Sequence, residues 1–191
     1  DGIDRTDPGI INMFTSGSNL SEIQALEQLS LQPVCVSYEW EPCDVLKAIE
    51  LCRREAGPYV KVPDEDFNII KTGLLQPKGH VRFHICEALT PDDLASLPAH
   101  KASAFRKGVA ELVDRRICQS YALFPNNYIA HDMLHSSEKY SSFYRQEDKE
   151  RFIMHLAALD AYGETCDPVG LRRHFLGIYA NPVDSLNLFC K

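Results

Sequence analysis

Apolar residues in the first half of the chain follow short strand-like and helix-like patterns. The run at residues 33–38 is continuously β-prone and too short for a helix, which predicts a strand inside a sheet that is covered on both faces. Residues 80–86 alternate, with Val81, Phe83 and Ile85 on one side, which predicts a half-buried strand. Helical spacing predicts short helices near residues 10–14, 21–29, 44–56 and 67–75.

From Thr90 onwards the pattern becomes helical. Thr90 followed by Pro91 is typical of an N-cap and the first residue of a helix. Two amphipathic stripes follow, Phe105, Val109, Leu112, Val113 and Ile117, and then Phe152, Ile153, Leu156, Leu159 and Tyr162. We therefore expect the α/β fold class, with an α/β layer region at residues 1–89 and a helical region at residues 90–191.

Composition and charge exclude several classes of protein. A chain of 191 residues with 45% hydrophobic content can bury one sizeable core. The net charge of -7, without any basic run, predicts no nucleic-acid partner. Seven cysteines without a C-x-x-C pair favour buried, reduced thiols in a cytosolic protein, and no apolar run reaches the roughly 18 residues of a membrane span. The start at Asp1, without Met, predicts a break in a longer protein.

Two histidine patterns suggest chemistry. His131 and His135 stand four residues apart, a spacing that places two imidazoles on one helix face, as in zinc sites. A metalloprotease needs Glu beside the first histidine, where this chain has Asp132, and the sequence identifies no third ligand. We therefore favour structural histidines and no metal, with a zinc-dependent hydrolase as an alternative.

The second pattern is His155 with Asp160, an H-x4-D spacing in which a carboxylate can orient a general base. About 0.5 such matches are expected by chance at this composition, and residues five apart on a helix point in different directions. We expect no catalytic role for this pair. Cys35 and Cys86 lie in the two predicted strands, where packing is the favoured role. The chain has no G-x-S-x-G elbow, Walker loop or dinucleotide fingerprint.

Arg5 lies in a loop-like opening that is rich in Asp and Gly. Its guanidinium could contact a phosphate in a bidentate manner. The alternative is that Arg5 pairs with Asp4 or Asp7 as an ordinary loop residue.

Four segments resemble the lysophosphatidate and glycerol-3-phosphate acyltransferase superfamily, specifically a bacterial branch with a helical C-terminal extension. Residues 1–11 (DGIDRTDPGII) look like the stretch that directly follows the family's Glu-Gly-Arg phosphate-binding motif. Residues 32–44 are similar to the family's fourth block, a strand entered through proline. Residues 78–83 look like the strand after that block, and residues 125–132 look like a signature of the extension.

The resemblance implies that residues 1–89 are the C-terminal part of an acyltransferase α/β sheet domain and that residues 90–191 are its helical extension. It implies transfer of a fatty acyl group from acyl-CoA or acyl-carrier protein, as co-substrate, to a glycerol-phosphate acceptor, without another cofactor. The catalytic H-x4-D and Glu-Gly-Arg motifs are expected upstream of Asp1, so this chain holds no catalytic residue and should be inactive alone. Gly2, Arg5 and Pro33 are the expected substrate-binding residues.

The lipid substrate implies peripheral contact with the inner, cytoplasmic face of the cell membrane through the parent protein. A different class of function also fits the long amphipathic stripes. The alternative is a non-catalytic helical module that binds a partner protein.

Overall fold

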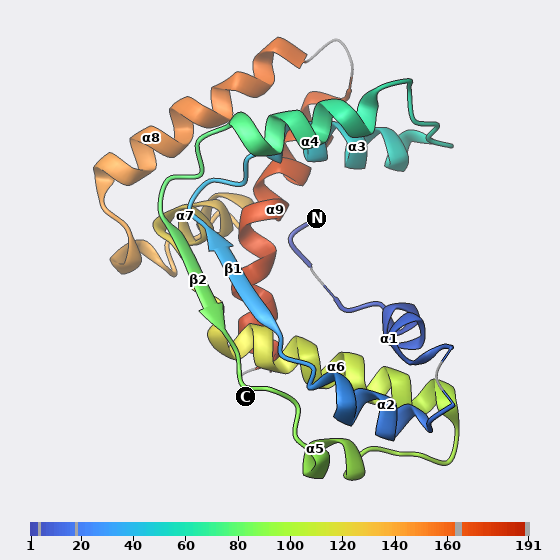
Figure 1. Ribbon diagram of the computed structural model, residues 1–191. Coiled ribbons are helices and arrows are strands. Elements are labelled where there is room, and N and C mark those ends of the chain that lie inside the picture. Colours follow the sequence, from blue (N-terminus) through green and yellow to red (C-terminus); the bar gives the residue numbers. More distant parts are fainter. Residues whose placement is uncertain (4, 18, 163–165, 190–191) are drawn as a thin grey trace. The chain divides into compact units, whose positions relative to one another are not determined.

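The computed structural model describes residues 1–3, 5–17, 19–162 and 166–189, and this part of the chain is mostly helical (Figure 1). Its elements are α1 (Pro8–Thr15), α2 (Glu22–Leu29), β1 (Val34–Tyr38), α3 (Asp44–Ala56), α4 (Glu65–Leu75), β2 (Val81–Ile85), α5 (Pro91–Ala95), α6 (Ala102–Ser120), α7 (Pro125–Leu134), η1 (Ser141–Phe143), α8 (Gln146–Leu156), η2 (Ala157–Tyr162) and α9 (Pro168–Phe189). The elements predicted from the sequence therefore form close to their expected positions.

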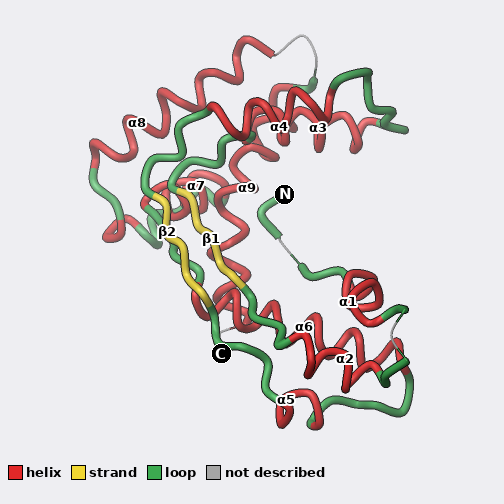
Figure 2. The backbone as a smooth tube through the Cα atoms, viewed as in Figure 1, coloured by secondary structure: helices red, strands yellow, loops and turns green. Residues whose placement is uncertain are grey.

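The predicted α/β layer architecture is wrong. Within the described residues, β1 and β2 form a two-stranded antiparallel sheet (Figure 2), and the expected C-terminal part of an acyltransferase sheet domain does not form. Every residue of β2 is exposed, including Val81, Phe83 and Ile85, which were expected to be half-buried. The physical reason is that alternation shows which side chains share a face, but it does not show whether another layer covers that face.

The described chain divides into two compact units that are interleaved along the sequence. Unit 1 consists of the described residues within Asp1–Ile3, Ser37–Val81 and Ala122–Asn187. Unit 2 consists of the described residues within Asp4–Val36, Arg82–Tyr121 and Leu188–Lys191. Each unit therefore contains residues from both sides of position 89. The proposed boundary at residue 89, between an acyltransferase domain and its helical extension, stays a prediction.

The core of unit 1 lies among α3, α7, α8 and α9. Phe152 of α8 and Phe175 of α9 are fully buried, and Tyr179 packs edge-on against Phe152 with ring centroids 5.4 Å apart. Trp40, which follows β1, stacks on Phe152 at 6.0 Å. The other buried apolar members are Ala48, Ile49, Cys52, Ile129, Ala130, Leu156, Leu159, Leu171, Leu176, Ile178 and Ala180. Aromatic rings therefore join α8 to α9 in this unit.

Unit 2 has its own core, made by α1, α2, α5 and α6. Its buried apolar members are Ile11, Leu26, Leu89, Leu94, Phe105, Val109 and Val113. The ends of the short helices are fixed by side chains, since Ser21 and Gln24 form a capping box on α2 and Thr90 and Asp93 form one on α5. Sequence signals of this kind act locally, which explains why these helix starts were predicted correctly.

The N-terminal segment of unit 1 lies against α9 near a proline inside that helix. Pro182 has no N–H to donate to the carbonyl oxygen of Ile178, four residues earlier. Gly2 has φ +74°, and a Cβ at this position would lie only 2.4 Å from that oxygen, so only glycine fits here. Asn181 Nδ2 donates a hydrogen bond of 2.6 Å to the carbonyl of Asp1. The first residues are thus held on the interrupted turn of α9.

Candidate functional site

A histidine–carboxylate pair joins α8 to the start of α3 in unit 1. His155 Nε2 lies 2.7 Å from Oδ2 of Asp44, which is buried at the first position of α3. The indole of Trp40 packs edge-on against the His155 ring, with centroids 4.7 Å apart. In the neutral tautomer of His155 that carries its proton on Nε2, the Nε2–H group donates to Asp44. Nδ1 then holds the lone pair and can accept a proton from another group.

Tyr179 of α9 completes this polar group. Its hydroxyl donates to the same Asp44 oxygen at 2.6 Å and accepts from the backbone N–H of Glu41 at 3.1 Å. Burial, followed by the negative charge of Asp44, raises the pKa of Tyr179 well above its usual value, so the phenol stays protonated and acts as a donor. One carboxylate therefore connects α3, α8 and α9.

A pocket of about 520 Å³ adjoins this group. Its lining comes from the loop after β1, from α3 and α4, and from α8 with η2, and includes Trp40, Cys43, Asp44, Thr72, His155 and Tyr162. Cys43 is a weak nucleophile here because burial, followed by the charge of Glu41, raises the pKa of its thiol. The pocket can support proton transfer through His155, and its thiol is not activated for covalent chemistry.

His155 does not pair with Asp160, its H-x4-D neighbour in sequence. Asp160 lies exposed in η2, and in the described part of the chain no hydrogen bond or ion pair joins the two residues. The carboxylate at His155 comes instead from Asp44, 111 residues earlier. No sequence spacing would have identified it, although Asp44 itself was recognised as part of the start of a helix.

A second polar cluster surrounds Glu39, directly after β1. Its buried carboxylate accepts from the backbone N–H of His80 at 2.9 Å and lies 2.6 Å from His80 Nδ1. Its carbonyl oxygen accepts from Asn126 Nδ2 of α7 at 2.6 Å. Gly79 has φ +62°, and a Cβ there would lie 2.5 Å from Glu39 Oε2. Three segments distant in sequence thus meet at one glutamate.

Asp148 lies at the edge of this cluster, in the first turn of α8. The backbone N–H of Arg145, followed by the side chain of Arg151, lowers the pKa of the Asp148 carboxyl. The ionised carboxylate therefore stabilises the fold at pH values above its unfolded pKa of about 3.9, and this contribution is lost as the pH falls through the lowered folded pKa. Acidification below about pH 4 should weaken unit 1 through this residue.

We expect Asp148→Asn to reduce the dependence of the free energy of unfolding on pH in that acidic window. The measurement is urea unfolding at a series of pH values between about 2 and 6. Glu147→Gln is the matched control, since the neighbouring Glu147 side chain is 79% exposed. Equal pH dependence in the wild-type protein and Asp148→Asn would contradict the assignment.

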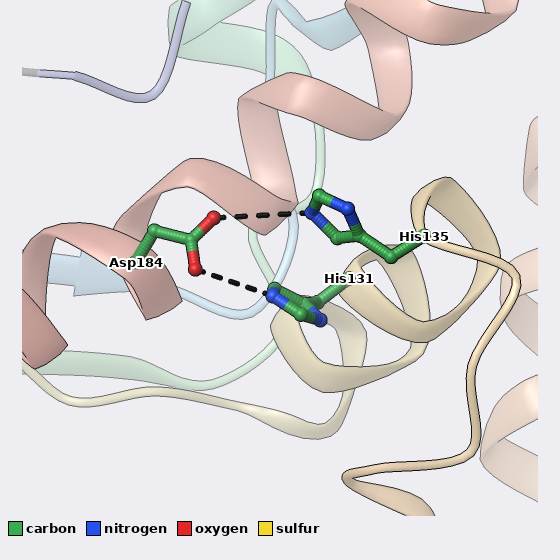
Figure 3. Close-up of side chains that lie close together, drawn as sticks. All are labelled: His131, His135 and Asp184. Carbon is green, nitrogen blue, oxygen red and sulfur yellow. Dashed lines mark hydrogen bonds and ion pairs between the residues drawn. The ribbon is translucent and has the colours of Figure 1, made fainter.

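His131 and His135 face a third residue that the sequence did not reveal. Both imidazoles turn towards the carboxylate of Asp184 on α9, each facing a different oxygen (Figure 3). The ligand atoms of the three residues lie within 4.8 Å of one another. The sequence carried no signal for Asp184, because its approach to α7 depends on how α7 and α9 pack.

The predicted substrate-binding residues belong to different units. Gly2 lies against α9 in unit 1, whereas Arg5 and Pro33 belong to unit 2. Arg5 is exposed, and Pro33 is buried with its carbonyl accepting from the backbone N–H of Cys86 at 3.0 Å. A common substrate-binding role for the three residues stays a prediction.

The cysteines of the two strands are buried. Cys35 and Cys86 are each 2% exposed, in keeping with a packing role. No disulfide bond joins any of the described cysteines, which are Cys35, Cys43, Cys52, Cys86, Cys118 and Cys166. Cys190 lies outside the described residues.

Comparison with known proteins leaves the family undetermined. No protein-family model, curated protein or solved structure matches this chain. Among the described helices, none has the length and apolar character needed to cross a membrane. The resemblance to acyltransferases therefore remains an inference from four sequence segments.

Proposed function

We propose that this chain is part of an acyltransferase that transfers a fatty acyl group from a thioester donor to a glycerol-phosphate acceptor, and that it is inactive alone. The observation that carries the proposal is the cluster at Glu39. Glu39, His80 and Asn126 come from three of the four segments that resemble the family, and their contacts link those segments directly. These contacts support the proposal because they bring three of the four resembling segments together in one cluster.

The fourth resembling segment, residues 1–11, adds support because its first residues are held on α9. Asp1 and Gly2, which would directly follow the family's Glu-Gly-Arg motif, are fixed on α9 by Asn181 and by the close approach to Ile178. In the proposed parent protein, a phosphate-binding motif just before Asp1 would therefore have a rigid attachment on the helical region. Arg5, exposed and cationic, is a candidate for an additional phosphate contact.

The proposed chemistry belongs to the parent protein. An upstream histidine, oriented by its aspartate, takes the proton of an acceptor hydroxyl as the hydroxyl oxygen attacks the thioester carbonyl. The new C–O ester bond forms, the C–S bond breaks, and the proton passes to the departing thiolate. In this scheme the His155–Asp44 pair holds α3, α8 and α9 together and takes no part in transfer.

Helix α4 is consistent with the proposed contact with the cytoplasmic face of the cell membrane. It buries no residue, and Phe67, Ile70 and Leu74 recur on one side, 62–76% exposed. An apolar helix face of this kind suits insertion into the interfacial region of a lipid surface. The same surface also favours the alternative function, a helical module that binds a partner protein.

The test is an acyl-transfer assay with acyl-CoA or acyl-carrier protein as donor and glycerol 3-phosphate or lysophosphatidate as acceptor. We expect no turnover by the 191-residue chain and measurable turnover once the upstream coding sequence is joined to it. The joined protein should lose activity when the upstream H-x4-D histidine is replaced and keep it in His155→Ala.

Two results would contradict the proposal. The first is an upstream sequence that lacks both H-x4-D and Glu-Gly-Arg, and the second is turnover by this chain alone that depends on His155. An inactive joined protein that binds one defined partner, with binding abolished by Leu74→Glu, would establish the alternative instead.

A further inference from the structure

Two helices of unit 1 bring together a set of side chains that resembles a metal site. His131 and His135 lie one turn apart at the end of α7, with ring centroids 4.4 Å apart. Asp184 comes from α9, two residues after Pro182. Figure 3 shows the carboxylate of Asp184 facing both rings. One of its oxygens lies 3.2 Å from His131 Nε2, and the other lies 3.9 Å from His135 Nε2.

These separations are close to those in a coordinated metal ion. Bonds of about 2.0–2.2 Å to imidazole nitrogen and carboxylate oxygen place neighbouring ligand atoms about 3.3 Å apart in a tetrahedral site. The pair formed by His131 and Asp184 already has this spacing. The ligand atoms of the other two pairs need to approach each other by about 1 Å. The side chains of His135 and Asp184 can make this movement because each is about half exposed.

Burial of the first histidine provides an independent observation. The His131 side chain is only 8% exposed, and its Nδ1 has no hydrogen-bond partner among the described residues. Its Nε2 is directed at Asp184, so its polar interaction is made through this cluster. Nε2, the atom of His131 that faces Asp184, is therefore the atom that a metal ion would bind, and Nδ1 would keep its proton.

We propose that His131, His135 and Asp184 bind one divalent transition-metal ion of the zinc type, linking α7 to α9. Two imidazoles and one carboxylate are a ligand set that such ions accept, and hard ions such as Mg²⁺ disfavour it. Three protein ligands leave at least one coordination position for water on the exposed side of His135 and Asp184. The inference does not depend on the proposed acyltransferase function.

The experiment is a titration of the full chain with Co²⁺ in the presence of a non-thiol reductant. We expect one equivalent to bind and to give the visible absorption of cobalt in a nitrogen and oxygen environment. One equivalent of Zn²⁺ should then remove that absorption. A near-ultraviolet thiolate-to-cobalt band would instead assign the binding to cysteines and overturn the proposal.

Site variants identify the ligands. His135→Ala and Asp184→Asn should each lower cobalt affinity at least about tenfold, and both should keep the far-ultraviolet circular dichroism of the wild-type fold because the replaced side chains are half exposed. His84→Ala is the control, since His84 is an exposed histidine outside the cluster and its loss should leave affinity unchanged. Unchanged affinity in both site variants, or no cobalt binding by the wild-type protein, would refute the site.

Discussion

Phe152→Ala should destabilise unit 1 by about 3–5 kcal/mol, the range for removing a large, fully buried aromatic ring. Phe152 is 0% exposed and contacts the rings of Trp40, Phe175 and Tyr179. Its removal loses the burial of the ring and leaves a cavity between α8 and α9 that the surrounding aromatic side chains can fill only in part.

The measurement is urea unfolding followed by tryptophan fluorescence. Trp40 is the single tryptophan of the chain and lies in the same unit, so its signal reports on the core that the substitution changes. Met154→Ala is the matched control on the same helix, because Met154 is 69% exposed and should change stability by no more than about 0.5 kcal/mol. Similar effects of both substitutions would mean that Phe152 is not a core residue.

Asp44→Ala is the second change with a large expected effect. It removes the acceptor for the Tyr179 hydroxyl and for His155, and Tyr179 is only 2% exposed. Each buried donor left without an acceptor costs about 1–3 kcal/mol. We expect a loss of roughly 3 kcal/mol in the free energy of unfolding, measured by the same urea titration.

A double-mutant cycle separates the contribution of the hydrogen bond between Tyr179 and Asp44 from other effects of the Asp44→Ala substitution on stability. Tyr179→Phe removes the buried hydroxyl, so Asp44→Ala should cost less in that background, by about 0.5–3 kcal/mol. Asp160→Ala is the control, since Asp160 is the exposed carboxylate of the H-x4-D pattern and should have little effect. Additive losses in the cycle, or a large effect of Asp160→Ala, would argue against the Asp44 assignment.

Local signals predicted much of the secondary structure. The capping residues Ser21 and Thr90 mark helix starts because their side chains bond backbone N–H groups only three residues away. The stripe that begins at Phe152 was predicted correctly at Phe152, Leu156 and Leu159, which are buried. Ile153 and Tyr162 remain 44% and 38% exposed.

Long-range features could not be predicted in this way. His155 has a carboxylate five residues away in sequence, yet its partner is Asp44, whose position depends on how α3 packs against α8. Asp184 joins His131 for the same kind of reason, since α7 and α9 are separated by α8 in sequence. The size of the sheet that the described residues form is a further case, because the residue pattern of a strand does not show how many other strands pair with it.

The interleaving of the two units has a consequence for synthesis on the ribosome. The apolar core of unit 2 contains residues from Ile11 to Val113, whereas that of unit 1 needs residues as far as Ala180. Chains emerge from the N-terminus and fold as their parts become complete, so unit 2 can close first. Until α7, α8 and α9 emerge, Trp40 and the buried residues of α3 lack the core partners that these helices supply. We therefore expect residues 37–81, an internal segment, to expose apolar side chains while the rest of unit 1 is being synthesised.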